Sequence, residues 1–352
     1  MLSSNGRKAA LCCFVFTLAT AVLRTASADD AAPATPATEA PPSPPVAEAP
    51  VDVPPPASKP APPPYSIPWQ LRAAAATNAV RLDTAFAGYE NAAPPSGPYT
   101  KSGGFTVASI LNASVKIPGT GAKWAGLAPL VRVAVVNDSP PTGSGGFVFV
   151  NPIVGANYAV DLGSGLRAAF FLGGSVPIGG GGDALPAKSG AADARNAGIY
   201  ARSAMDNSLF AVNDFAVIPG VDLAYVGGGV TVQAEATLFQ LFRVRNDDVQ
   251  KEATKTNFTT GLHVGYFLAA PLSIGAELRY QRWLNAPIAV DQNKPNTSVD
   301  TLTVALGPRF HIPLGGGAYA RPGVAYAMGL NQVMSASAMN YHIVQVDIPV
   351  IF

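Results

Sequence analysis

The sequence predicts an all-β protein, namely a closed antiparallel up-and-down barrel of about twelve strands that spans a membrane. Three observations support this fold class: short runs in which apolar and polar residues alternate, connections that are alternately brief and long, and charges confined to one side of each run. The last run shows the alternation most clearly. Its apolar residues Val344, Val346, Ile348, Val350 and Phe352 occupy every second position, as in a strand with one apolar face.

From about Ala79 onward, clusters of Gly, Pro, Asn and Asp divide the chain into twelve expected strands. The connections after the even-numbered strands are brief, and those after the odd-numbered strands are longer. Short turns at one end and long loops at the other are typical of a barrel inserted from the periplasm, and an even strand number leaves both chain ends on that side. The expected strands are 79–90, 104–117, 127–138, 146–161, 165–178, 214–226, 229–245, 257–268, 272–284, 300–313, 317–330 and 341–352.

The position of the charges is a stricter test, because a charge that faces lipid at mid-depth costs about 2–4 kcal/mol. In the expected strand 272–284, Glu277 and Arg279 lie on the parity opposite to the apolar residues. The exceptions to this rule, Glu90 and Arg282, fall near the expected external rim. A soluble β-sandwich also alternates, but here the polar parity is rich in small residues and only 13% of the chain is charged, which favours lipid contact.

The terminal run, with its alternating apolar residues and its aromatic end, resembles the C-terminal signature of Gram-negative outer-membrane β-barrels. In architecture the chain is similar to small outer-membrane porins and to the outer-membrane transporter family of the phenol-degradation MetA-pathway type. The resemblance implies a place in the bacterial outer membrane, contact with its lipid, passage of small solutes, and recognition of the last strand by the barrel assembly machinery. No binding residue carries over, because no motif matches beyond that strand. The residues of this C-terminal assembly signal are Val346, Ile348, Val350 and Phe352.

The chain before the barrel divides into two expected segments. Residues 1–28 have the basic start, the apolar run and the small-residue cleavage site of a secretory signal peptide, and both cysteines fall within it. Residues 29–68 form a leader rich in Pro and Ala that buries too little apolar surface to become ordered. We expect a disordered spacer, or a tether to a periplasmic partner, followed by the barrel domain at 69–352.

The same parity rule places nine basic and five acidic side chains in the lumen. One interpretation is a mixed-charge belt that selects polar or mildly anionic solutes in a channel or transporter. The alternative is a network of ion pairs that fills a non-conducting structural or adhesive barrel. A turn at 269–271 would place His263 opposite Glu277. The candidate selectivity residues are Asp83, Arg132, Asp222, Glu235, His263, Glu277, Arg279, Arg309, Arg321 and Asp347; the other basic residues on this parity are Arg81, Lys116, Arg167, Arg243 and Arg245.

Two connecting segments are candidates for narrowing the lumen. The connection 179–213 is too long for a plain hairpin, and it would fold inward as a constriction, cap the barrel outside or form a disordered tip. Residues 191–205 within it could form a short helix. The segment 69–76, just before the first strand, would enter the lumen as a plug or place Trp69 at the membrane interface. The candidate constriction residues are Asp193, Arg195, Tyr200, Arg202 and Asp206.

The sequence contains no motif for a cofactor, a metal or nucleic acid. It has no phosphate-binding loop, and it has only three histidines and no cysteine beyond the expected signal. Removal of Arg7, Lys8 and Arg24 with the signal leaves 20 of the 23 basic residues against 22 acidic ones. Membrane-embedded hydrolases place a Ser near a His along one strand, and neither His263-Val264-Gly265 nor His311-Ile312-Pro313 contains one. We therefore expect neither a cofactor nor enzymatic activity.

Overall fold

The computed structural model describes residues 65–91, 103–118, 126–141, 145–183, 190–247, 251–292, 299–331, 334 and 339–352. All of them belong to one compact unit, Pro62–Phe352. The expected signal peptide and residues 29–64 of the expected leader lie outside the described residues. Residues 65–68, which we assigned to the leader, are described, and their side chains are buried.

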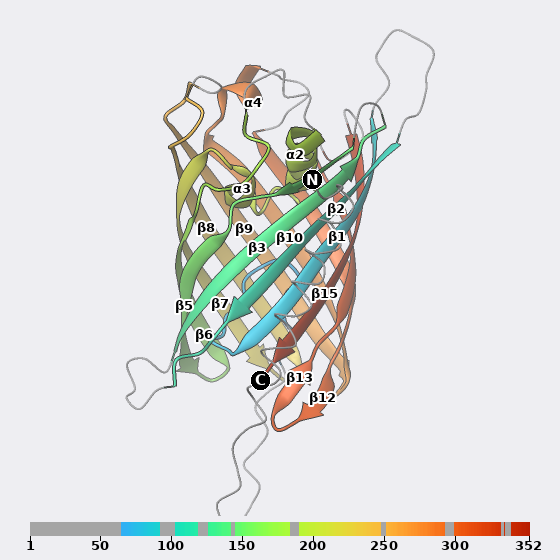
Figure 1. Ribbon diagram of the computed structural model, residues 1–352. Coiled ribbons are helices and arrows are strands. Elements are labelled where there is room, and N and C mark those ends of the chain that lie inside the picture. Colours follow the sequence, from blue (N-terminus) through green and yellow to red (C-terminus); the bar gives the residue numbers. More distant parts are fainter. Residues whose placement is uncertain are drawn as a thin grey trace, which may run out of the picture. The chain divides into compact units, whose positions relative to one another are not determined.

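The strands form one closed antiparallel sheet with twelve strand positions, as predicted (Figure 1). The ring closes where β1 (Ala79–Asn91) pairs with β15 (Met339–Ile351), from Ala79 opposite Ile351 to Asn91 opposite Met339. The first strand therefore begins at the rim where the last strand ends. The other strands are β2 (Gly103–Ser114), β3 (Leu127–Ser139), β4 (Gly146–Phe149), β5 (Ile153–Gly163), β6 (Leu166–Ser175), β7 (Asp214–Gly227), β8 (Val230–Arg243), β9 (Thr254–Ala269), β10 (Leu272–Asn285), β11 (Asp300–Phe310), β12 (Ile312–Gly315), β13 (Ala318–Ala320) and β14 (Gly323–Gly329).

Three of the twelve positions are each made of two short strands. β4 and β5 both pair with β3, and between them Pro152 lacks the N–H that a continuous ladder needs. β12 continues from β11 and pairs with β13, which leads into β14, and this small hairpin forms one end of the barrel (Figure 1). The expected strands 146–161, 300–313 and 317–330 are therefore present, each with one interruption.

Glycine permits the tight turn between β7 and β8. β7 ends at Gly227 and β8 begins at Val230, so Gly228 and Gly229 alone form the turn. Both have positive φ angles, 59° and 78°, which a type I′ hairpin turn requires at its two central positions. This brief connection, predicted after the sixth strand, is thus set by backbone conformation.

Side chains alternate between an apolar outer face and a polar inner face along the long strands. In β10, Leu278 on the outer face is 43% exposed, whereas Glu277 on the inner face is 0% exposed. In β15, Ile348 is exposed and Asp347 is buried. The predicted confinement of mid-strand charges to the inner face is confirmed in both strands. A closed, even-stranded barrel with an apolar exterior is the form in which strands cross the outer membrane, and the chain is an outer-membrane β-barrel.

The described helices are short: α2 (Gly190–Ala201), α3 (Asn207–Phe210) and α4 (Ile288–Gln292). In the part of the chain that the structure describes, no helix is long and apolar enough to span a membrane. α2 lies largely within the helix predicted at 191–205. α4 was not predicted; the carbonyl of Pro287 accepts hydrogen bonds from the N–H groups of Val290 and Asp291, which closes its first turn.

Candidate functional site in the barrel lumen

Residues 65–78, here called the plug segment, run through the barrel lumen before β1 begins. The side chains of Tyr65, Ile67, Trp69 and Leu71 are all buried. The segment turns back on itself, because the N–H of Ala74 donates to the hydroxyl of Tyr65 at 2.9 Å. Of the two locations that the sequence allowed for this segment, the structure shows the lumen.

Carboxylates of the wall bind N–H groups at the tip of the plug segment. Glu277 on β10 accepts hydrogen bonds from the N–H groups of Trp69 and Gln70, the latter at 3.2 Å. Glu235 on β8 accepts one from the N–H of Arg72 at 2.5 Å. A buried segment outside the sheet has no ladder partners for these groups, so wall side chains must supply the acceptors.

Amide side chains of the wall bind carbonyl groups on the returning half of the plug segment. Asn157 on β5 donates from Nδ2 to the carbonyls of Ala73 and Ala75, at 3.2 Å in each case. Gln233 on β8 donates from Nε2 to the carbonyl of Arg72. Wall side chains therefore bind backbone groups in both halves of the segment.

Trp69 is the largest buried side chain of the plug segment. Its ring centroid lies 5.9 Å from that of His263, edge to face, and 5.6 Å from the guanidinium carbon of Arg309. His263 is directly opposite Glu277 in the sheet register, as predicted, with Nδ1 3.6 Å from Oε1. The predicted histidine–carboxylate pair thus lies beside the tryptophan.

Arg72 lies between two carboxylates that face each other across the sheet and pairs with both. Asp222 and Glu235 are register partners on β7 and β8, and like charges directly opposite each other repel. Nε of Arg72 lies 3.3 Å from Asp222, and Nη1 lies 3.4 Å from Glu235. We did not predict Arg72 as a site residue, because it precedes the first strand and has no strand parity. The facing carboxylates were the available signal that a cation from elsewhere lies between them.

Glycines on the inner wall make room for the plug segment. A Cβ added to Gly275 would lie 3.0 Å from the ring of Trp69, and one added to Gly261 would lie 2.5 Å from Leu71. A Cβ at Gly275 would also lie 2.9 Å from His263 of the wall, so a side chain at either site would require its neighbours to shift, and these glycines let the plug segment approach the wall closely. Two further overlaps of the same kind are those of Gly220 with Arg72 and of Gly265 with Ser66.

The connection after β6 also folds into the lumen. It is described at residues 176–183 and 190–213, here called the lumenal loop, and it carries α2 and α3. Leu209 in α3 is fully buried. Ser203 and Ala204 between the two helices have positive φ angles of 53° and 52°, a conformation that costs about 1–2 kcal/mol per residue. Contacts with the wall must hold this turn, and the inward alternative for the connection 179–213 is the one observed.

Two charged residues anchor the lumenal loop to the wall. Arg202 donates to both oxygens of Asp83, at 2.9 and 2.7 Å, and Asp206 accepts from Arg132 at 2.7 Å. Burial opposes ionisation of Asp206, but Arg132 and Arg202 outweigh it, so the pKa of Asp206 is lowered. Burial also opposes the charge of Arg202, but Asp83 and Asp206 raise its pKa. Both side chains therefore stay charged and tie the lumenal loop to β1 and β3.

The plug segment and the lumenal loop meet inside the barrel. Gln70 donates from Nε2 to the carbonyl of Arg202 at 2.7 Å and to Asp206 at 3.0 Å. One side chain at the tip of the plug segment thus contacts both anchoring residues of the lumenal loop. Movement of either segment would break these contacts.

Most residues of the predicted mixed-charge belt are joined by ion pairs and hydrogen bonds, whereas Asp222 and Glu235 pair with Arg72 and Arg321 donates to the carbonyl of Tyr65. Asp347 lies 2.8 Å from Arg81, while Gln345 donates to Asp83 and accepts from Arg279, at 2.9 Å each. A role of the belt in selectivity stays a prediction. The ten candidates, all buried or half-buried, are Asp83, Arg132, Asp222, Glu235, His263, Glu277, Arg279, Arg309, Arg321 and Asp347.

Three of the five candidate constriction residues take no part in the ion pairs that Arg202 and Asp206 form with the wall. Asp193 is exposed, and Arg195 donates to its neighbour Asn196 at 3.0 Å. Tyr200 packs on Tyr341 of β15, with ring centroids 5.5 Å apart. These residues lie on α2, which has one exposed face and one packed face. The sequence did not show which face of this helix turns toward the wall.

A serine on β10 contacts a histidine that lies between β11 and β12. Oγ of Ser273 lies 2.8 Å from Nε2 of His311, and the imidazole packs on Phe267 with ring centroids 4.5 Å apart. We considered only serines close to a histidine along one strand, and that criterion misses a cross-strand pair. Ser273 is fully buried, so this contact is enclosed by protein.

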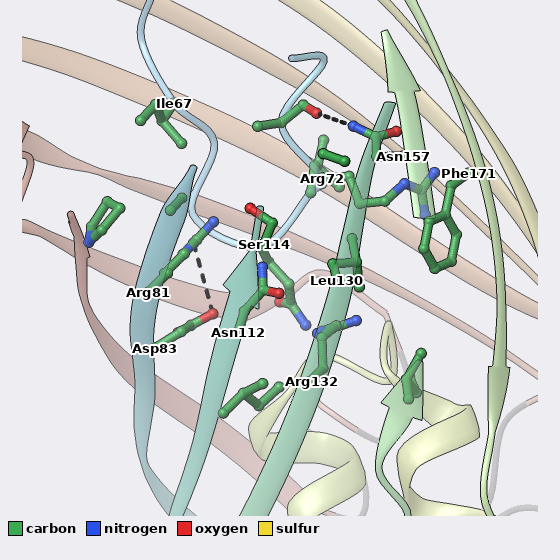
Figure 2. Close-up of a pocket in the computed structure, with 18 of the residues that line it drawn as sticks. Ile67, Arg72, Arg81, Asp83, Asn112, Ser114, Leu130, Arg132, Asn157 and Phe171 are labelled. Atoms are coloured by element: carbon green, nitrogen blue, oxygen red, sulfur yellow. Dashed lines mark hydrogen bonds and ion pairs between the residues drawn. The ribbon is translucent and has the colours of Figure 1, made fainter. Parts of the chain in front are cut away.

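A cavity of about 130 Å³ remains between the plug segment, the lumenal loop and the wall (Figure 2). Residues of β1, β2, β3, β5, β6, β7, β8 and β15 line it, together with Met205 and Asp206 of the lumenal loop. Its charged lining residues are of both signs: Arg72, Arg81, Arg132, Asp83, Asp206 and Glu235. The lumen is therefore not packed solid around the plug segment.

Neither a protein-family model nor a curated protein matches the chain. An outer membrane channel from Pseudomonas putida F1 is similar in structure, with a TM-score of 0.49 and 10% identity over 82% of this chain and 100% of that chain. The NanC porin has a TM-score of 0.44 and 11% identity over 77% of this chain and 98% of its own. The KdgM porin has a TM-score of 0.41 and 9% identity over 77% and 99%. At these identities no role of an individual residue carries over.

Proposed function

We propose that the protein is an outer-membrane channel for small polar solutes, closed by the plug segment and opened when that segment moves. The observation that carries the proposal is the way the plug segment is held. Its backbone is bound by wall side chains such as Glu277, Glu235 and Asn157, and not by a strand ladder. Water would solvate these polar groups once the segment left, so the sheet stays intact in the open state.

The contacts that hold the plug segment are weak enough to be broken without unfolding the barrel. A hydrogen bond contributes about 0.5–1.5 kcal/mol net, and about 1.5–3 kcal/mol when one partner is charged. Burial of Trp69 and Leu71 adds about 1.5–3 kcal/mol for each side chain. The plug segment is thus held by a limited set of contacts, whereas the long strands are paired along their length on both sides. We expect the plug segment to move before the barrel opens anywhere else.

A filled, non-conducting barrel is the second candidate, and the ion pairs favour it. Arg202 lies 2.7 Å from Asp83, and Arg309 lies 3.0 Å from Asp347, with all four side chains nearly buried. Removing one partner of such a pair costs about 3–5 kcal/mol, so a lumen built from them resists opening. The function would then be structural or adhesive.

Planar-bilayer conductance separates the two candidates. We expect little current from the full chain and a steady current from a form that lacks residues 66–76, because the plug segment no longer blocks the lumen. The double variant Leu71→Cys/Gly261→Cys should form a disulfide that locks the segment, since a Cβ at Gly261 points at the side chain of Leu71. The small current of the full chain should be absent from the oxidised variant and should return after reduction.

The matched control is the double variant Leu71→Ser/Gly261→Ser, which has the same side-chain size and cannot form a disulfide, and the electrophoretic mobility of unheated samples shows that each barrel is folded. Absence of current from the folded deletion form would sink the channel proposal and leave the filled barrel. Current that is the same before and after reduction of the double variant, once the disulfide is verified, would show that the plug segment is not the gate.

A further inference from the structure

Acceptor groups of the wall bind N–H groups along the plug segment. Thr231 on β8 accepts from the N–H of Ser66 at 2.9 Å. Glu235 on the same strand and Glu277 on β10 accept from N–H groups nearer the tip of the segment. All three wall side chains are buried. Each of these buried acceptors is thus matched to a backbone N–H group.

Donor groups of the wall bind carbonyl groups of the same segment. Gln345 on β15 donates from Nε2 to the carbonyl of Trp69 at 3.1 Å. Gln233 on β8 and Asn157 on β5 donate to carbonyl groups of the returning half. The strands β5, β8 and β15 lie on different sides of the ring, so the wall surrounds the backbone with groups of both kinds.

Side chains contribute little to the recognition of the returning half. Residues 73–76 are all alanine, and Asn157 binds the carbonyls of Ala73 and Ala75 at 3.2 Å. Every residue carries the same carbonyl group, and every residue except proline carries the same N–H group. A site built from such contacts recognises a peptide chain largely independently of its sequence. The buried side chains of Trp69 and Leu71 at the tip add the contacts that are particular to this segment.

We infer that the solute of the channel is an oligopeptide and that the plug segment occupies the peptide site while the channel is closed. Once the segment moves out, the same donors and acceptors are available to the backbone of an entering peptide. That backbone supplies to Glu277 and Glu235 the N–H groups that the plug segment supplies in the closed state. The inference rests on the proposed function, of which it names the solute class.

Uptake of labelled solutes into liposomes that contain the full-length protein tests this assignment. The probes are tetra-alanine, tetra-sarcosine and cellobiose, and both tetramers carry an N-acetyl group and a C-terminal dimethylamide. Tetra-sarcosine is the isomer of tetra-alanine with its methyl groups on nitrogen, so it keeps the carbonyl groups and lacks every N–H group. Cellobiose is a polar solute without a peptide backbone. We expect tetra-alanine to enter at least about tenfold faster than either, a factor that corresponds to about 1.4 kcal/mol.

The outcomes separate the peptide assignment from the channel proposal. Equal uptake of tetra-alanine and tetra-sarcosine, or of tetra-alanine and cellobiose, would overturn the peptide assignment and leave the channel in place. Absence of uptake of all three by the folded protein would overturn both. The oxidised Leu71→Cys/Gly261→Cys protein should take up none of them, and uptake that persists in it would show that the solutes do not pass through the site of the plug segment.

Glu235→Leu removes one acceptor of the wall and leaves Arg72 paired with Asp222 at 3.3 Å. We expect the ratio of tetra-alanine to tetra-sarcosine uptake to fall at least about threefold. This ratio does not depend on how often the plug segment moves out, because both probes enter through the same open state. A folded Glu235→Leu protein with an unchanged ratio would overturn the inference.

Thr303→Val is the matched control for this variant. Thr303 on β11 is fully buried, and its hydroxyl has no hydrogen-bond partner in the part of the chain that the structure describes. The change preserves side-chain size, so the uptake ratio should equal that of the unaltered protein. A ratio that falls as far as in Glu235→Leu would show that any change in the wall has this effect, which would also overturn the inference.

Discussion

Arg72 shows how much one side chain of the plug segment contributes to the wall. Without it, Asp222 and Glu235 would face each other unpaired in a buried position. We expect Arg72→Met to lower the free energy of unfolding by about 3–5 kcal/mol, the cost of removing one partner from a buried pair. Denaturant unfolding in detergent, followed by tryptophan fluorescence, measures this loss.

Two further variants identify the cause of that loss. Arg72→Lys keeps the positive charge and should lose less stability than Arg72→Met. The double variant Arg72→Met/Asp222→Asn removes the repulsion and should recover most of the loss. A double variant no more stable than Arg72→Met would contradict the role of the facing carboxylates.

The sequence was sufficient to place wall residues but not plug residues. A period of two fixes the face of a strand on which a residue lies, so Glu277 and Asp347 were predicted inside and are found there. The plug segment follows no such period, and nothing in its sequence shows that Gln70 and Arg72 meet wall carboxylates or the lumenal loop. Those contacts depend on how a non-repetitive segment turns within the lumen.

The lumenal loop is the element whose position depends most on charge. The lowered pKa of Asp206 means that its stabilising contribution is complete above the ordinary Asp pKa of about 3.9 and is lost as the pH falls toward the lowered value. The raised pKa of Arg202 keeps its charge throughout this range. We therefore expect hydrogen-exchange protection of residues 190–213 to be constant between pH 8 and about pH 5 and to fall only in stronger acid.

Asp206→Asn is the control for this behaviour. The neutral side chain cannot form ion pairs with Arg132 or Arg202, so the variant should show weaker hydrogen-exchange protection of the lumenal loop at pH 7. Because the carboxylate is absent, its titration should cause no further loss of protection as the pH falls. Loss of protection in the unaltered protein between pH 7 and pH 5 would show that a different group controls the loop.

The helix of the lumenal loop was predictable, but its location was not. The residues of α2 were expected within 191–205, and the helix is found at Gly190–Ala201. Whether it capped or entered the barrel depended on the contact of Arg202 with Asp83, which lie 119 residues apart. A pairing of that sequence separation leaves no local pattern.

At the scale of the whole barrel, strand number, order and closure were predictable because every strand repeats the same rule. Turn residues separate the strands, and each strand must pair with its neighbours and turn an apolar face to lipid. Pairing of β1 with β15 then follows from the requirement that no strand edge is left open in the membrane. It stays a prediction that the assembly machinery recognises the last strand through Val346, Ile348, Val350 and Phe352.

The charge balance of the whole lumen predicts anion selectivity once the gate is open. Arg81 and Arg132 border the lumenal cavity, and strand parity places nine basic against five acidic side chains in the lumen. We expect the reduced Leu71→Cys/Gly261→Cys channel to prefer chloride over potassium, most clearly at low salt, where screening is weakest. The reversal potential in a potassium chloride gradient measures this preference.

Arg132→Gln should reduce the chloride preference, because it removes the most exposed of these guanidinium groups. A potassium preference in the parent channel would show that Asp222 and Glu235, freed when Arg72 moves away, dominate the open lumen.

The glycines of the inner wall also constrain how this chain can change. Each lies where a larger residue would collide with the inserted chain, so enlargement on one side has to be met by a smaller residue on the other. Residues of the wall and of the plug segment must therefore change together at these positions. We expect a barrel that lacks its plug segment to bind a separate peptide of that sequence, in contact with Gly220, Gly261, Gly265 and Gly275.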